Sequence, residues 1–107
     1  ENPVLGQAIT AAVFLNGVMV SDSDNMLVAF IGPEEVGSGH PVYIPVTADY
    51  IFEFMVYGDI YSVGEQVNLA LLDAKTDKLC FAKENIIFTP NDYTGTSKNP
   101  LVLEIIC

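Results

Sequence analysis

The residues of this chain that could carry catalytic chemistry are few and dispersed. Its only histidine, His40, lies in a Gly-Ser-Gly-His-Pro turn sequence, where a solvated turn residue is more common than a general base. A serine or cysteine nucleophile needs such a base with an orienting group beside it. Glu34 and Glu35 are adjacent, and we interpret them as part of a solvated turn instead of a facing pair that cleaves glycosides. We therefore expect no enzymatic activity.

The candidate metal ligands favour a hard cation over a soft one. One histidine and two distant cysteines do not supply a zinc ligand set. Asp22, Asp24 and Asn25, with nearby serine hydroxyls and loop carbonyls, offer the oxygen ligands that calcium prefers. The segment is not an EF-hand loop, because Pro33 takes the place of the closing glutamate. Such a loop is most often simply solvated, and a calcium site at these residues is the hypothesis set against that interpretation.

Four tyrosines are the candidate ligand-binding residues: Tyr43, Tyr57, Tyr61 and Tyr93. A tyrosine combines a flat apolar ring with a hydroxyl group, which suits it to the face of a sugar. The alternative is that these rings rim the hydrophobic core, as tyrosines commonly do. They make carbohydrate recognition a second hypothesis for the function.

The two cysteines, Cys80 and Cys107, are predicted to form a disulfide. Their bridge would close a loop of about 27 residues and stabilise the fold by roughly 3.5 kcal/mol in the chain-entropy model. It would also indicate an oxidising compartment. Two other arrangements stay open, namely two buried free thiols and the pairing of Cys107, the last residue, with another molecule.

The charge of the chain excludes nucleic acid as an expected partner. Fourteen acidic residues face four lysines and no arginine, which gives a formal net charge of -10. This charge repels a phosphate backbone, and no guanidinium is present to bind one. Half of the 107 residues are apolar, which is enough to form a single packed domain over residues 1–107. No apolar run reaches the roughly 18 to 20 residues that cross a bilayer, so we expect a soluble chain without membrane insertion.

The elements that must position these residues are predicted to be short strands. Residues 8–15 and 18–20 flank Asn16-Gly17, the dipeptide best suited to a type I′ hairpin turn. In residues 50–57 the phenylalanines alternate with other residues, so their face should belong to the core. Further strands are expected at residues 26–31, 42–46, 66–71, 79–82, 86–88 and 101–106, while the short segment around Val36 is bounded by turn residues on both sides.

These eight or nine short strands, with no convincing helix, predict an all-β fold. Strands at regular spacing in a chain near 100 residues favour an antiparallel β-sandwich of immunoglobulin-like or jelly-roll architecture. The segment of residues 89–100 is expected to be a polar loop.

Several predicted strands are apolar on both faces. Residues 8–15 carry apolar side chains in both alternating sets, and residues 26–31 are apolar throughout. A sandwich strand in water usually has a polar outer face. Either small alanines and a central position account for this pattern, or a neighbouring subunit or domain covers it. The first strand, from about residue 4, and the last, residues 101–107, are also candidates for pairing with another copy's edge.

Residues 24–37, with the sequence DNMLVAFIGPEEVG, resemble β-sandwich modules of secreted and cell-surface multidomain proteins of Bacteroidetes-type bacteria. The likeness continues through residues 41–43, 52–58, 64–67 and 71–74, and so spans most of residues 9–88. Those modules often carry an arginine where Val36 precedes Gly37 here, so a contact that depends on this arginine is not expected. The resemblance implies a secreted or cell-surface location and a sandwich architecture, without a catalytic signature. The first residue, Glu1, is not methionine, which fits a removed leader or an excised fragment.

Together these observations predict a non-catalytic extracellular module for surface assembly or adhesion. Its expected partners are copies of itself, as in a filament or fibre, or neighbouring protein domains. The alternative is a carbohydrate-binding module that binds glycans. No cofactor is required, and calcium is the one candidate.

Overall fold

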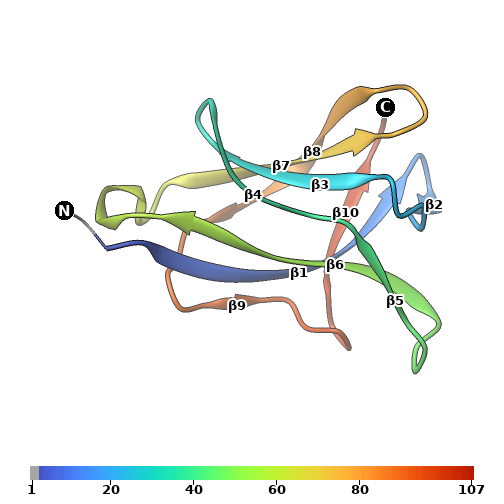
Figure 1. The fold of residues 1–107 in the computed structure, drawn as a ribbon, viewed down its shortest axis with the longest axis horizontal. Helices are drawn as coiled ribbons and strands as arrows, with labels where there is room; N and C mark the ends of the chain where they lie inside the picture. The colour runs from blue at the N-terminus through green and yellow to red at the C-terminus, as the bar shows by residue number, and fades with distance from the viewer. Residues whose placement is uncertain (1–2) are drawn as a thin grey trace.

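The computed structural model describes residues 3–107 and consists of two β-sheets packed face to face (Figure 1). Sheet A has the strand order β10-β1-β6-β5, with β2 and β9 also paired to β1, and sheet B has the order β4-β3-β7-β8. The strands are β1 (Leu5–Leu15), β2 (Val18–Met19), β3 (Met26–Ile31), β4 (Glu34–Gly39), β5 (Pro41–Ile44), β6 (Asp49–Gly58), β7 (Gln66–Asp73), β8 (Lys78–Ile87), β9 (Tyr93–Thr94) and β10 (Leu101–Ile105).

The predicted all-β sandwich is confirmed, with differences in individual strands. Its pairs are mainly antiparallel, but β1 pairs in parallel with β9 and β10. The strand count is ten in the described residues, because strands also form at β4 and, within the expected 89–100 loop, at the two-residue β9. The separate strands predicted at residues 79–82 and 86–88 were wrong. They are one strand, β8, whose register shifts opposite Asn68 and Ala70 of β7.

The β1–β2 hairpin confirms the predicted type I′ turn. Asn16 and Gly17 both have positive φ angles, 51° and 84°, as this turn requires. Asn16 also holds the end of the chain. Its backbone N–H donates to the Ile105 carbonyl at 2.8 Å, and its side-chain oxygen accepts from the Cys107 N–H at 3.0 Å.

The hydrophobic core lies between the two sheets and uses alternate residues of each long strand. On β6 the predicted face is buried, with Phe52 and Val56 both fully inaccessible to solvent. Ile51, on the opposite face of this strand beside Val42 of β5, is buried as well. The other inward residues come from β1, β3, β7 and β10 and from the residue after β8: Ile9, Ala11, Val13, Leu27, Ala29, Val67, Leu69, Leu71, Phe88, Leu103 and Ile105.

At one edge of the sandwich, β4 packs directly against β6 of the opposite sheet. Two inward positions of β4 are glycines. A Cβ atom at Gly37 would overlap the Met55 carbonyl oxygen, and one at Gly39 would lie 3.0 Å from the Cβ atom of Phe54. These glycines let the two backbones approach, and the chain then passes from sheet B to sheet A through His40.

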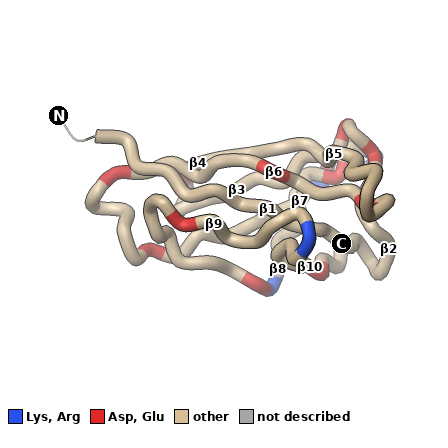
Figure 2. The backbone as a smooth tube through the Cα atoms, turned by 90° about the horizontal axis from the view of Figure 1, so that it is seen from below, with Lys and Arg blue, Asp and Glu red and all other residues tan. Residues whose placement is uncertain are grey.

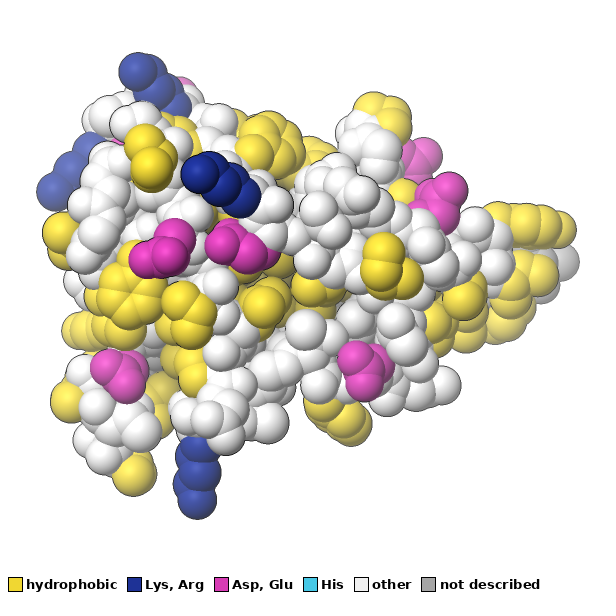
Figure 3. Space-filling view, turned by 180° about the vertical axis from the view of Figure 1, so that it is seen from behind, with side chains coloured by type: hydrophobic (Ala, Val, Ile, Leu, Met, Phe, Trp, Pro, Cys, Tyr) yellow, Lys and Arg dark blue, Asp and Glu magenta, His cyan; other side chains and the backbone are white. Residues whose placement is uncertain are grey.

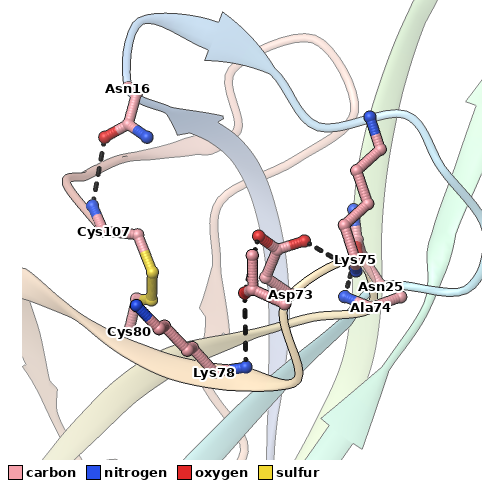
Figure 4. Close-up of a disulfide and its surroundings, with 9 residues drawn as sticks. Asn16, Asn25, Asp73, Ala74, Lys75, Lys78, Cys80 and Cys107 are labelled. Carbon is pink, nitrogen blue, oxygen red and sulfur yellow. Dashed lines mark hydrogen bonds between the residues drawn. A yellow bond between two sulfur atoms is a disulfide. The ribbon is translucent and has the colours of Figure 1, made fainter.

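At the other edge, the Cys80–Cys107 disulfide joins β8 of sheet B to the residue that follows β10 of sheet A (Figure 4). The two Cα atoms are 5.5 Å apart, within the usual range for a disulfide. This confirms the predicted bridge and rules out the arrangements with free thiols or with Cys107 bonded to another molecule. Figure 4 also shows Asn16 holding the Cys107 backbone beside the bridge.

Gln7 links β1 by side-chain hydrogen bonds to the residues that follow β8. Its side chain is almost fully buried and donates to the Thr94 hydroxyl at 2.9 Å, while its oxygen accepts from the Thr89 N–H at 3.0 Å. These bonds close the sandwich beside the end of β8. Within residues 3–107, no helix is long and apolar enough to cross a membrane.

Candidate functional site

The histidine and the adjacent glutamates lie apart from each other and make different contacts. The His40 imidazole donates from Nδ1 to the Asn25 carbonyl oxygen at 2.9 Å, which ties the loop before β3 to the crossover after β4. Glu34 and Glu35 are exposed, as expected, but they belong to strand β4 instead of a turn. The turn before them is confined to Gly32 and Pro33, and Gly32 has a positive φ of 57°.

The acidic loop of Asp22, Asp24 and Asn25 is held by its own hydrogen bonds. The Asp22 carboxylate accepts from the Asp24 N–H at 3.0 Å. Asn25 is buried, and its side-chain oxygen accepts from the Ala74 N–H at 2.8 Å, so it links this loop to the β7–β8 turn. Among the described residues, no three His, Cys, Asp or Glu side chains are grouped as metal ligands would be. A calcium ion here would depend on Asp22, Asp24 and backbone carbonyl oxygens.

The calcium prediction is tested by thermal unfolding in excess calcium and in excess chelator. A bound ion stabilises the folded state by mass action, so calcium is expected to raise the melting temperature. The variant Asp24→Asn should reduce that rise, whereas Asp49→Asn, in the β5–β6 hairpin, should not. Equal melting temperatures in calcium and chelator would contradict the prediction.

Of the four candidate tyrosines, the structure brings Tyr57 and Tyr61 together. Both line an open groove of about 980 Å³ at the end of the sandwich from which the N-terminus leaves. Tyr43 lies on the edge strand β5, where its ring centroid is 5.1 Å from that of Tyr50. Tyr93 lies on β9, paired beside Ala8 of β1. The predicted set of four is therefore divided, and only one pair shares a cavity.

The groove is formed by the β3–β4 turn on one side and the β6–β7 connection on the other. The connection contains the short 3-10 helix η1 (Ile60–Ser62), and Asp59 caps it by accepting from the Tyr61 N–H at 2.9 Å. The charged residues that line the groove are all acidic: Glu34, Glu35, Asp59 and Glu65. Exposed carboxylates beside two tyrosine rings can accept hydrogen bonds from hydroxyl groups of a ligand.

A second candidate surface is the outer side of sheet B, which we call the sheet B face. Its outward residues alternate with the core residues of the same strands, and they are all apolar at its centre: Met26, Val28, Phe30, Ala70, Leu72, Leu79 and Phe81. Phe81 is 54% exposed and Leu79 is 42% exposed. The Phe81 ring lies 5.8 Å from that of Phe30, so two aromatic rings stand next to each other on this face.

Strands that are apolar on both faces have a different explanation in each sheet: small alanines in sheet A, and a surface that a partner could cover in sheet B. On β1 of sheet A, outward Ala12 is buried by its neighbours, so small alanines account for that pattern. On sheet B, Val28 and Ala70 are also buried, but the aromatic and leucine side chains around them stay in contact with solvent. Figure 2 shows that charged residues lie mainly on turns and strand ends, while the long central strands are almost entirely uncharged.

Sequence reasoning identified residues 26–31 as apolar on both sides but missed Leu79 and Phe81. The available signal was Cys80: a half-cystine that faces the core forces its two neighbours on the strand to face outward. Along the upper margin of Figure 3, where sheet B lies, hydrophobic side chains stand beside lysines.

Comparisons with protein-family models, curated proteins and solved structures find no match for this chain.

Proposed function

We propose that this chain is a non-catalytic extracellular interaction module that assembles with copies of itself through the sheet B face. The observation that carries the proposal is the exposure of Phe81 and Leu79 around a continuous apolar surface on β3, β7 and β8. Contiguous exposed apolar surface on a soluble domain is typical of an interaction site. Aromatic residues at the centre of such a surface contribute strongly to binding.

The extracellular location is supported by the disulfide, which persists in oxidising compartments. The resemblance to secreted β-sandwich modules points the same way. A non-catalytic role is supported by the position of His40, whose Nδ1 hydrogen bonds to a backbone carbonyl and so acts in holding two loops together.

Self-association is tested by sedimentation velocity over a concentration series. The wild-type chain is expected to shift from monomer to dimer or larger species as its concentration rises. Phe81→Glu places a charge within the apolar face and should weaken association by about tenfold or more. Because Phe81 is exposed, this variant should fold normally.

The matched control is Tyr93→Glu, which introduces the same charge at an exposed aromatic residue of sheet A. It should associate as the wild type does. A wild-type chain that stays monomeric at millimolar concentration, with and without calcium, would contradict self-assembly.

The second candidate function is carbohydrate binding in the groove that contains Tyr57 and Tyr61. The specific observation in its favour is that two exposed rings and four carboxylates line one open cavity. Sugar rings stack on aromatic faces, and their hydroxyl groups donate to carboxylate oxygens.

This function is tested on a glycan array followed by titration calorimetry. Tyr61→Ala is expected to weaken binding to any recognised glycan by about tenfold or more, since it removes one of two stacking faces. Tyr43→Ala, outside the groove, should leave affinity unchanged. The absence of any hit on a broad array would exclude this candidate.

A further inference from the structure

The two edge strands that border the sheet B face carry opposite charges. On one side, β4 carries Glu34 and Glu35, and on the other side β8 carries Lys78 and Lys83. Between them, β3 has no charged residue, and the only one on β7 is Asp73 at its end, which is largely buried. The remaining acid of β8, Glu84, has a buried carboxylate oxygen and so turns into the molecule. The apolar face therefore has an acidic edge and a basic edge.

The strand register places Glu35 and Lys83 at almost the same height along the strands. Glu35 pairs with Phe30. Phe30 pairs with Asn68, and Asn68 with Asn85, which defines one row across the sheet. The next row runs through Val28 and Ala70 to Phe81. Lys83 lies between Phe81 and Asn85 on β8, and so between these two rows. Glu35 thus lies beside Phe30 at one edge of the face, and Lys83 follows Phe81 along the strand at the other edge.

We infer that two copies pair through their sheet B faces about a two-fold axis parallel to the strands, with β4 of each copy against β8 of the other. This inference rests on the proposed self-association and specifies its geometry. Rotation about such an axis exchanges the edges, so Glu35 of each copy faces Lys83 of the other, twice per dimer. A two-fold axis across the strands would instead place acid over acid and base over base, which opposes association.

The same arrangement buries the apolar centre. Two face-to-face sheets pack about 10 Å apart with their strand directions nearly aligned, so Phe30 and Phe81 of both copies would interdigitate. The complementary edges would then set the orientation in which this contact forms, which is the usual contribution of charge at an interface. Lys83 also lines a small pocket with Glu84 and Glu104 of its own copy. A substitution of Lys83 therefore changes the charge of that pocket as well, and the experiment must distinguish this local effect from an effect on the dimer.

Charge reversal tests the geometry in sedimentation experiments on the whole chain. Glu35→Lys and Lys83→Glu are each expected to weaken the dimer by about tenfold, because each places like charges opposite one another. The double variant exchanges the two charges and should restore an affinity within about threefold of the wild type. A purely local effect of Lys83→Glu on its own copy would not be rescued by Glu35→Lys.

A zero-length carbodiimide cross-link provides a direct readout without substitution. Glu35 and Lys83 of one copy are separated by three strand spacings, roughly 14 Å, which is too far for an amide bond to form within the monomer. We expect a Glu35–Lys83 cross-linked peptide in the dimer band and not in the monomer band.

The possible failures are distinguishable. If the wild type is monomeric throughout, the proposed function fails. If Phe81→Glu disrupts the dimer but both reversals leave it unchanged and no Glu35–Lys83 peptide forms, the face is correct and this two-fold arrangement is overturned. If the dimer tolerates Phe81→Glu, the sheet B face itself is overturned as the interface.

Discussion

Replacing Gly37 with alanine is expected to destabilise the fold by about 3 kcal/mol or more, at the upper end of the range for overpacking a well-packed interior. The new Cβ atom would overlap the carbonyl oxygen of Met55 on β6, which is backbone and cannot rotate away. Either β4 must move off β6 or the two sheets must separate at this edge. For a domain of this size the melting temperature should fall by about 12 °C or more, measured by circular dichroism.

Ser38→Ala is the matched control, since Ser38 is the next residue of β4 and its side chain faces solvent. Its effect should stay within about 0.5 kcal/mol, as for most surface substitutions. Gly39→Ala should fall between the two variants, because its nearest neighbour is a side-chain carbon at 3.0 Å and not a carbonyl. A Gly37→Ala protein that melts like the wild type would show that β4 does not pack directly on β6.

Removal of the disulfide in the double variant Cys80→Ala/Cys107→Ala is expected to lower the free energy of unfolding by about 3.5 kcal/mol. The bridge spans 27 positions of sequence, and without it the unfolded chain gains the freedom of that loop. In the folded state it joins the edge strands of the two sheets where the Cys107 N–H also donates to Asn16. The melting temperature should fall by about 15 °C or more.

Urea unfolding with and without reductant checks this prediction. The wild type should lose the same amount of stability when it is reduced, whereas the double variant should not respond to reductant. If fully reduced wild type, verified by thiol titration, unfolds at the same urea concentration as the oxidised chain, the disulfide contributes no stability.

Several features of the fold were predictable because they depend on neighbours in the sequence. The Asn16-Gly17 turn is one, since positive φ at two successive residues selects this dipeptide. The buried phenylalanine face of β6 is another, since strand alternation fixes it locally. The Cys80–Cys107 bridge was the favoured arrangement of the only two cysteines, and the structure decided it against the two alternatives.

The predictions that failed depend on contacts with distant residues. Residues 34–39 contain two glycines, which are poor strand formers by composition, yet they form β4 because the glycines permit the close approach to β6. Residues 83–85 are charged or polar and separate two apolar runs, yet β8 continues through them by a register shift against β7. Tertiary packing outweighs local preference at both positions.

The candidate sites show the same division. The tyrosines were identified as a set by residue type, but only the fold could place Tyr57 and Tyr61 in one groove and leave Tyr43 and Tyr93 outside it. The sequence indicated the part of the sheet B face that lies on β3. Identifying Phe81 as exposed required knowledge of which side of β8 faces the core.

The sequence by itself determined the class of fold and the acidity of this protein, because alternation, turn chemistry and charge are properties of short segments or of composition. Only the tertiary structure decided which apolar side chains are covered and which are exposed, because burial depends on strands brought together from distant parts of the chain. The doubly apolar strands thus divide into a sheet A pattern accounted for by small residues and a sheet B face that exposes Leu79 and Phe81 on its β8 edge.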